Sequence, residues 1–308
     1  MKITILGAGA MGMLFGGYLS RNNQVWLLDV DAARVEKINA EGVRIREKDG
    51  SCQTFRPAAV TDSAGLPQMD LVVVFVKSMF TNDALARNRG LIGPQTYLMT
   101  LQNGAGHVAK LLAFADRAHV VIGTTQHNSS VIENGMINHG GSGPTAIGLL
   151  DGRGEALVPL AEQFSACGLA CSVNSDMKKK IWHKLFTNTA ASSLTPVLQV
   201  PLDFIAEDPH AHGLMERLCR EAVAVAAAEG AAFDAQAVID EVETVCRNAK
   251  GGYTSIYADI KNGNRTEVDT ISGSVVEAAR AAGIAVPCHE MVVALIHALE
   301  AKARLGVK

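Results

Sequence analysis

The chain has 308 residues, of which 48% are hydrophobic and 19% charged, a balance typical of a folded protein rather than a disordered one. Since single hydrophobic cores stop growing near about 250 to 300 residues, we expect two domains. The net charge of -3 leaves no broad positive surface, which argues against nucleic acid or an anionic membrane as a partner.

The cysteines, the histidines and the N-terminal segment carry no further signal. The six cysteines include no C-x-x-C pair, and the nine histidines form no H-E-x-x-H motif, so we expect reduced thiols, a cytoplasmic protein and no metal. His210 and His212 lie in a stretch expected to be a loop. Because five glycines interrupt the apolar start, we expect neither a signal peptide nor a membrane segment.

The first half of the chain alternates strand and helix patterns, as a parallel sheet with crossover helices requires. Short β-rich runs predict the strands, and apolar residues at helical spacing predict the helices between them. The expected strands are 3–6, 24–28, 71–76, 97–101, 120–123 and 169–173, and the expected helices are 10–20 and 32–41. Residues 136–139 and 145–149, on either side of Gly-Gly-Ser-Gly-Pro, are expected to pair as a hairpin.

The second half shows helical patterns only. The expected helices are 177–192, 214–229, 234–248, 255–262, 267–282 and 289–303. The change of pattern predicts a domain boundary near residue 174, with domains over 1–173 and 174–308.

A glycine-rich turn, Gly7-Ala8-Gly9-Ala10-Met11-Gly12, follows the first strand. Glycines at this spacing permit a tight turn, close approach of the backbone to a pyrophosphate and close helix packing. The turn opens a helix whose N-terminal amides can receive phosphate. The pattern predicts an α/β, Rossmann-type dinucleotide-binding domain before the all-α domain; the alternative is a purely structural turn.

Asp29, at the end of the second strand, bears on the choice of cofactor. A carboxylate there can accept hydrogen bonds from ribose hydroxyls and would repel a 2'-phosphate, which favours NAD over NADP. Two alternatives stay open. Asp29 or Asp31 could simply cap the helix that begins at Ala32, and Arg34 could turn toward a 2'-phosphate.

Polar residues also follow two later strands, Lys77 after 71–76 and Asn103 after 97–101. Open α/β sheets bind ligands beyond the carboxyl ends of their strands, so both residues are expected to face one crevice. Alternatively, Lys77 is a solvated loop cation and Asn103 a turn residue beside Gly104.

The helix expected over 177–192 carries Lys184, Asn188 and Ser192 at i, i+4 and i+8 on one face. That face offers an ammonium and two neutral hydrogen-bonding groups. Trp182 and Phe186 can pack into the core and hold it in place. The alternative is that Lys184 is solvated like the neighbouring lysines 178 to 180, although its surroundings are more apolar.

Glu267 is expected to open the helix over 267–282, with Thr266 as N-cap and Asp269 completing a capping box. Its ordinary explanation is a first-turn carboxylate that the helix dipole stabilises.

Together these stretches resemble the ketopantoate reductase family over nearly the whole chain. The marks are the opening Met-Lys-Ile-Thr-Ile-Leu-Gly-Ala-Gly-Ala-Met-Gly, Val-Lys at 76, Gln-Asn-Gly at 102, Gly-Thr-Thr at 123, Ile-Trp-His-Lys-Leu at 181, Thr-Glu-Val-Asp at 266 and Gly-Ile-Ala-Val-Pro at 283. Each motif is weak alone, and their joint order is specific.

The resemblance implies a role for each matching residue. Lys184 matches the catalytic lysine and Glu267 the acidic residue beside substrate and nicotinamide. Asn188, Ser192 and Ser255 fall at substrate-binding positions, and Lys77 and Asn103 at cofactor-side positions. The chain departs from the family twice: Ser192 replaces a frequent second asparagine, and Asp29-Val30-Asp31 replaces a basic residue expected for NADPH.

The implied reaction is NAD(P)H-dependent reduction of ketopantoate (2-dehydropantoate) to pantoate, a step of pantothenate biosynthesis, with Lys184 as proton donor. One alternative is an NADH-dependent reductase of another branched or aromatic 2-oxo acid. A remote alternative is a dinucleotide-sensing protein without turnover. The expected partner is a small 2-oxo acid, and a homodimer stays open.

Overall fold

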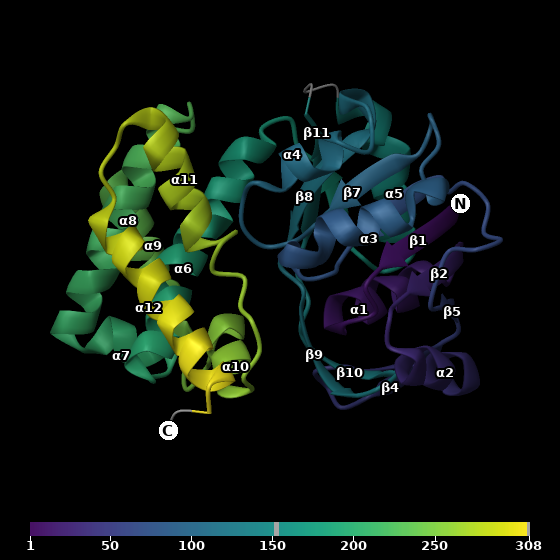
Figure 1. Cartoon of the computed structure of the whole chain (residues 1–308), viewed down its shortest axis with the longest axis horizontal. Coiled ribbons are helices and arrows are strands. Elements are labelled where there is room, and N and C mark those ends of the chain that lie inside the picture. Colours follow the sequence, from purple (N-terminus) through teal and green to yellow (C-terminus); the bar gives the residue numbers. More distant parts are fainter. Residues whose placement is uncertain (151–153, 307–308) are drawn as a thin grey trace. The chain divides into compact units, whose positions relative to one another are not determined.

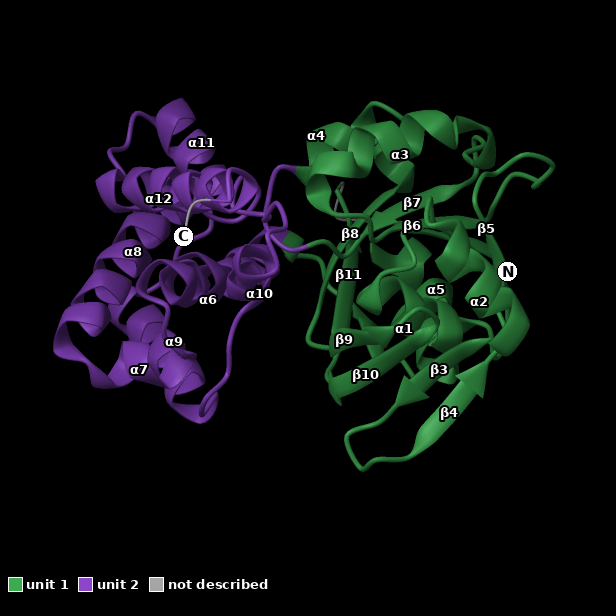
Figure 2. Ribbon diagram, turned by 60° about the horizontal axis from the view of Figure 1, so that its bottom comes forward, with its two compact units in different colours: residues 1–102, 107–177 green, residues 103–106, 178–308 purple. Residues whose placement is uncertain are grey.

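The computed structural model describes residues 1–150 and 154–306. Two compact units make up the chain (Figure 2): unit 1 comprises residues 1–102 and 107–177, and unit 2 comprises residues 103–106 and 178–308. Unit 1 is α/β and unit 2 is built from helices, which confirms the predicted fold class.

Unit 1 is built on an eight-stranded sheet in the order β12-β11-β8-β7-β6-β1-β2-β5. The strands are β1 (Lys2–Leu6), β2 (Gln24–Leu28), β5 (Ala58–Val60), β6 (Leu71–Val74), β7 (Tyr97–Thr100), β8 (Val120–Thr125), β11 (Thr145–Leu149) and β12 (Cys171–Val173). Adjacent strands of the part β8-β7-β6-β1-β2-β5 run parallel, whereas β11 is antiparallel to β8. The chain passes from β1 outward to β2 and later returns to β6 on the other side, which is the switch point at which such sheets bind ligands.

Helices cover both faces of this sheet. Figure 2 shows α3 and α4 on one face and α1, α2 and α5 on the other. The helices are α1 (Ala10–Leu19), α2 (Ala32–Glu41), α3 (Thr81–Arg87), α4 (His107–Leu112) and α5 (Val158–Ala166), with 3-10 turns at Ser78–Phe80, Arg89–Leu91, Arg117–His119 and Gly154–Leu157. All four residues of β6 are buried, as its unbroken apolar run predicted.

The predicted hairpin of residues 136–139 with 145–149 is wrong. A second sheet, β4-β3-β10-β9, packs on α1 (Figure 1) and consists of β3 (Val43–Arg46), β4 (Cys52–Phe55), β9 (Asn128–Glu133) and β10 (Met136–Gly141). β10 pairs with β9 through the turn at Asn134-Gly135, whereas β11 pairs with β8 in the large sheet. The glycine-rich linker therefore carries the chain from one sheet to the other, and the hairpin signal lay in Asn134-Gly135.

Unit 2 has a core of apolar residues from several helices, including Trp182 and Phe186, 3% and 2% exposed. Its helices are α6 (Met177–Leu198), α7 (Leu202–Glu207), α8 (Pro209–Ala228), α9 (Ala235–Asn248), α10 (Ser255–Lys261), α11 (Ser272–Ala282) and α12 (Pro287–Arg304). Two expectations are wrong. His210 and His212 lie in α8 rather than a loop, because Asp208 caps a helix that begins at Pro209. The helix expected from Glu267 begins at Ser272.

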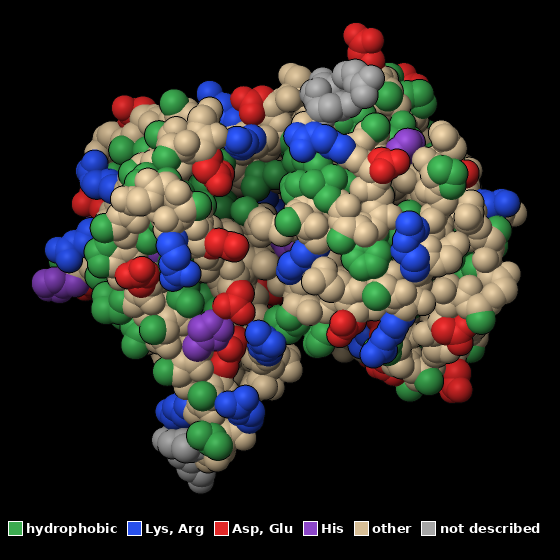
Figure 3. Space-filling view, turned by 45° about the horizontal axis from the view of Figure 1, so that its top comes forward, with side chains coloured by type: hydrophobic (Ala, Val, Ile, Leu, Met, Phe, Trp, Pro, Cys, Tyr) green, Lys and Arg blue, Asp and Glu red, His purple; other side chains and the backbone are tan. Residues whose placement is uncertain are grey.

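Acidic and basic side chains are interspersed on the face of the molecule shown in Figure 3, in keeping with the small net charge of -3. Within residues 1–150 and 154–306, no helix has the combination of length and apolar content that a bilayer span requires.

Candidate active site

The glycine-rich turn of unit 1 joins β1 to α1 at the carboxyl end of the strand. Gly7 has a φ of +99°, and a Cβ added there would lie 2.8 Å from the backbone nitrogen of Val76. A Cβ added at Gly12 would lie 1.8 Å from the carbonyl oxygen of Gly7. Backbone packing therefore requires glycine at both positions.

Gly9 differs, because no described atom lies within 4 Å of an added Cβ and its backbone is extended (φ -70°, ψ -168°). Gly9 is also the N-cap of α1, and among the described residues no side chain caps this helix end. The first amides of α1, including those of Ala10 and Met11, can thus receive an anion. The open space and the uncapped amides fit the pyrophosphate of a dinucleotide.

Two alanine substitutions separate the structural glycine from the binding glycine. We expect Gly12→Ala to destabilise the protein by at least about 2 kcal/mol, since the new methyl group meets rigid backbone. We expect Gly9→Ala to unfold like the parent protein but to bind NADH at least about tenfold more weakly, because its methyl group fills the space of the phosphates. Thermal unfolding and fluorescence titration with NADH measure the two effects. Unchanged NADH affinity in Gly9→Ala would favour a purely structural turn.

The carboxylate of Asp29 is fixed against this turn and is 10% exposed. Its Oδ2 accepts hydrogen bonds from the backbone N–H of Ala8 at 2.7 Å and from Nη1 of Arg34 at 3.0 Å, and its Oδ1 accepts one from Asp31 N–H at 3.0 Å. The cap of α2 is Asp31, whose Oδ1 accepts from the backbone N–H of Arg34. Asp29 is therefore not the helix cap.

A hydrogen bond joins the loops that follow β6 and β7. Nε2 of Gln102 donates to the carbonyl oxygen of Val76 at 2.6 Å, which joins the second loop to the residue before Lys77. Lys77 is half-buried and precedes the 3-10 turn at Ser78–Phe80. Gln102 is the residue here that the sequence prediction left out, although it lies in the quoted Gln-Asn-Gly motif.

Asn103 belongs to unit 2, with the short segment 103–106. In this segment the backbone N–H of Ala105 donates to the carbonyl oxygen of Thr270 at 2.9 Å, and a Cβ at Gly104 would lie 1.9 Å from the same oxygen. Gly104, with φ +95°, permits this close approach. Asn103 is thereby placed near the segment that carries Glu267.

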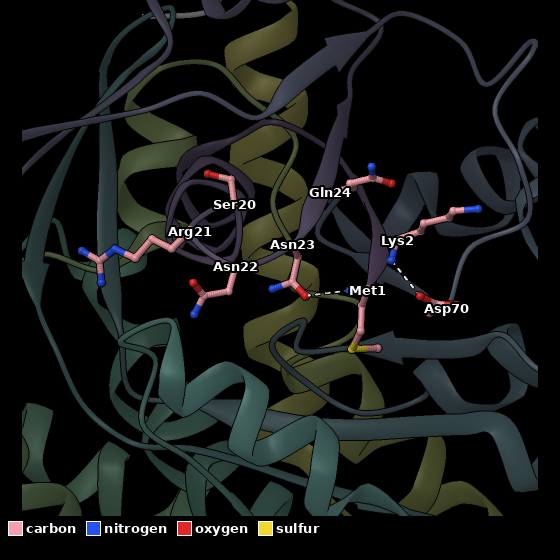
Figure 4. A pocket seen from close by; sticks show the side chains of 8 residues that line it. All are labelled: Met1, Lys2, Ser20, Arg21, Asn22, Asn23, Gln24 and Asp70. Atoms are coloured by element: carbon pink, nitrogen blue, oxygen red, sulfur yellow. Dashed lines mark hydrogen bonds between the residues drawn. The ribbon is translucent and has the colours of Figure 1, made fainter.

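A polar pocket at the other edge of the sheet holds none of the predicted site residues. It lies at the amino ends of β1 and β2 (Figure 4), lined by Met1, Lys2, Ser20, Arg21, Asn22, Asn23, Gln24 and Asp70. Because ligands of open α/β sheets bind at the carboxyl ends of the strands, we do not assign the cofactor to this pocket.

Lys184 differs from the other lysines of its helix. Lys178, Lys179 and Lys180 are exposed, whereas Lys184, like Asn188 and Ser192, is half-buried. Burial lowers the pKa of Lys184 to about 8, although the nearby negative charge of Glu267 acts to raise it. An amine with a pKa close to neutral pH can donate a proton and regain it readily.

Glu267 lies in a non-helical segment between α10 and α11, which corrects the sequence prediction. The predicted capping box fails because the hydroxyl of Thr266 donates to Glu300 and accepts from the backbone N–H of Val268. With α11 beginning only at Ser272, the helix dipole does not explain Glu267. Its electrostatic partner is Lys184.

Thr254, which directly precedes Ser255, links that residue to Ser192 of α6. The hydroxyl of Thr254 donates to the carbonyl oxygen of Ser192 at 3.3 Å and pairs with the hydroxyl of Thr195 at 2.7 Å. Thr254 is also the N-cap of α10, so exposed Ser255 begins that helix beside α6. Thr254 was not predicted, and its only local signal is a threonine before a short helical pattern.

In the described part of the chain, no group of three or more His, Cys, Asp and Glu side chains is arranged to hold a metal ion. Unit 1 has the glycine turn and strand order of a nicotinamide dinucleotide fold, and unit 2 has a lysine of lowered pKa beside a carboxylate. These features define the class of NAD(P)-dependent oxidoreductases.

Comparison with known families gives the particular family. Residues 3–152 match the family described as "Ketopantoate reductase PanE/ApbA", and residues 176–300 match "Ketopantoate reductase PanE/ApbA C terminal". The chain belongs to the ketopantoate reductase family, as its motifs predicted, and is an NAD(P)-dependent oxidoreductase.

Similar proteins carry two names. A 2-dehydropantoate 2-reductase of Halobacterium salinarum is 33% identical over 289 residues, 93% of this chain and 95% of the relative. That of Pyrococcus horikoshii is 29% identical over 97% of this chain and 98% of its own. Among solved structures, a D-mandelate dehydrogenase with NADH and anilino(oxo)acetate has a TM-score of 0.93 and 30% identity, covering 99% of this chain and 100% of that one.

Proposed function

We propose that the protein reduces the keto group of ketopantoate to the hydroxyl of pantoate. The observation that carries this proposal is the half-buried Lys184, whose pKa of about 8 lies near neutral pH and whose electrostatic partner is Glu267. Its support is the family membership and the two 2-dehydropantoate 2-reductases at 33% and 29% identity.

The residues of unit 1 fit a nicotinamide dinucleotide. We assign the pyrophosphate to Gly7, Ala8, Gly9, Ala10, Met11 and Gly12, and the adenosine ribose to Asp29. Lys77 and Asn103 are assigned to the cofactor side of the site. The reduced nicotinamide, when bound, supplies a hydride to the carbonyl carbon of the substrate.

Lys184 supplies the proton. As the carbon gains its fourth substituent, the electron pair of the C=O π bond moves to the oxygen, and the ammonium of Lys184 both stabilises that charge and donates a proton to it. Lys184 is left as a neutral amine that solvent protonates again. Glu267 favours the charged form of Lys184 and so helps to keep this general acid protonated at neutral pH.

Neutral polar side chains orient the substrate. We assign Asn188, Ser192 and Ser255 to its carboxylate and hydroxyl, because all three lie on the two helices that Thr254 joins. Hydrogen bonds to these groups hold the keto oxygen toward Lys184, and positioning of this kind is a large part of enzymatic rate acceleration.

A second candidate is an NADH-dependent reductase of another branched or aromatic 2-oxo acid. Its specific support is the likeness to D-mandelate dehydrogenase at a TM-score of 0.93, together with Ser192 and Asp29, which depart from the family pattern. A shorter side chain at position 192 leaves room for a larger substrate group.

A panel of 2-oxo acids distinguishes the two candidates. We expect kcat/KM for ketopantoate to exceed that for 2-oxoisovalerate, which lacks the hydroxyl, by at least about tenfold, since a site built to bind a hydroxyl rejects the analogue without it. Steady-state rates at saturating NADH, with phenylglyoxylate as the aromatic member, provide the measurement. Higher kcat/KM for phenylglyoxylate would replace the first candidate with the second.

A further inference from the structure

The segment that carries Glu267 has little secondary structure to hold it. It lies between α10 and α11, and the carbonyl oxygen of Glu267 accepts the backbone N–H groups of Thr270 and Ile271, both at 3.1 Å. The chain therefore turns tightly directly after Glu267. Because no helix fixes the residues before this turn, the position of the Glu267 side chain depends on contacts with other elements.

Glu300 of α12 contacts the segment on the N-terminal side of Glu267. Its Oε1 accepts hydrogen bonds from both the backbone N–H and the hydroxyl of Thr266, each at 2.7 Å. Thr266 is 1% exposed, and its hydroxyl oxygen also accepts from the backbone N–H of Val268 at 3.2 Å. Glu300 thus holds Thr266, and the hydroxyl of Thr266 in turn holds Val268 on the other side of Glu267.

His297, one turn earlier on α12, completes the arrangement. Its Nδ1 lies 3.0 Å from Oε2 of Glu300, and its Nε2 lies 2.9 Å from Oδ1 of Asp269, which also pairs with Arg265. Burial lowers the pKa of His297, but the hydrogen bonds and charges of Glu300 and Asp269 outweigh it, so the pKa lies above its ordinary value. The charged ring can donate to both carboxylates at once.

We propose that Glu300 is a positioning residue, which fixes the segment 266–269 through Thr266 and so holds the carboxylate of Glu267 beside Lys184. This inference rests on the proposed function of Lys184 and Glu267 and adds a residue 34 positions away from Thr266. The negative charge of Glu267 raises the pKa of Lys184, so a displaced Glu267 leaves that pKa lower. Loss of Glu300 therefore reduces the fraction of Lys184 that is charged.

The test compares Glu300→Ala with Glu290→Ala, an exposed glutamate on the same helix. The measured quantity is the pH at which half of the Lys184 side chains are deprotonated, called here its pH midpoint. It is obtained from the pH dependence of the acetylation rate of Lys184, followed by mass spectrometry, which needs neither substrate nor cofactor. We expect the midpoint to move to lower pH in Glu300→Ala, toward its value in Glu267→Gln, and to stay unchanged in Glu290→Ala. We expect kcat to fall by about 10- to 100-fold, with a smaller change in KM.

Two further variants separate positioning from charge and from loss of fold. Glu300→Gln keeps an oxygen that can accept hydrogen bonds from Thr266, so we expect the pH midpoint of Lys184 in this variant to stay close to that of the parent protein. Thr266→Val lacks the hydroxyl while Thr266→Ser keeps it, and we expect the pH midpoint of Lys184 to move to lower pH only in the valine variant. This pair tests the same contact even if Glu300→Ala does not fold.

A double variant gives the decisive result. If Glu300 acts through Glu267, Glu267→Gln with Glu300→Ala has the same midpoint as Glu267→Gln alone. A further shift in the double variant, or an unchanged midpoint in both Glu300→Ala and Thr266→Val, would overturn the proposal. Failure of the proposed function has a different signature, since the midpoints would respond as expected while no 2-oxo acid is reduced.

Discussion

Replacing Lys184 with methionine should lower kcat for 2-oxo acid reduction by about 10²- to 10⁴-fold, the usual contribution of a general acid. Methionine fills a similar volume but has no proton to donate. The matched control is Lys180→Met, which removes an exposed lysine one turn earlier on the same helix. We expect the control to keep parental kcat, and equal small losses in the two variants would make Lys184 an ordinary helix charge.

The pH dependence of the parent protein follows from the same residue. A general acid must be protonated, and the pKa of Lys184 is about 8, so kcat for reduction should fall as pH rises through about 8. Oxidation of the hydroxy acid needs the neutral amine, and its kcat should rise over the same range. A reduction rate that stays constant to pH 10 would contradict this assignment.

Stability provides a check that the Lys184→Met variant remains folded. The pKa of Lys184 falls from 10.5 to about 8 on folding, so at neutral pH the folded state bears the cost of a buried ammonium. Between pH 8 and 10.5 the unfolded state binds more protons, and the parent gains stability as pH rises. We therefore expect Lys184→Met to melt at a higher temperature than the parent at pH 7, with a smaller difference at pH 10.

Much of unit 1 could be predicted because its elements are delimited by strong local signals. The predicted bounds of β2 and α2 coincide with those observed, since an apolar strand, a capping aspartate and a glycine turn follow one another closely. The second sheet was not predicted. β9 is exposed at most of its positions, and β10 pairs with β3 across 92 residues of sequence (Met136 with Arg44), so no local pattern indicates this sheet.

In the candidate site, too, local sequence patterns could be interpreted, whereas contacts between residues distant in sequence could not. Helical periodicity predicted that Lys184, Asn188 and Ser192 share a face, and the apolar neighbours separated Lys184 from three exposed lysines. The contact of Glu300 with Thr266 spans 34 residues and leaves no local pattern. The capping prediction at Thr266 failed for this reason, because the hydroxyl of the threonine has a tertiary partner, Glu300 of α12.

The second prediction concerns the cofactor, for which the residues of this chain differ from the family pattern. Asp29 is fixed at the end of β2 by Ala8 and Arg34, and Arg34 is already paired with Asp29 at 3.0 Å and Asp31 at 3.4 Å. A 2'-phosphate would have to compete with two carboxylates for one guanidinium. A ribose diol would instead donate hydrogen bonds to Asp29. We propose that NADH is used at least as well as NADPH.

Two serine substitutions of equal charge change test this proposal. Asp29→Ser removes the ribose acceptor and releases Arg34 toward a 2'-phosphate, so we expect the ratio of kcat/KM for NADPH to that for NADH to rise by at least about tenfold, or 1.4 kcal/mol. Asp31→Ser removes a charge that lies 3.4 Å from Arg34 but keeps a good helix cap, and we expect a smaller change. General damage to the glycine turn would lower kcat/KM for both NADPH and NADH and leave the ratio of the two values unchanged. A clear NADPH preference in the parent protein, abolished by Arg34→Gln, would instead make Arg34 the phosphate ligand and leave Asp29 as a support for the turn.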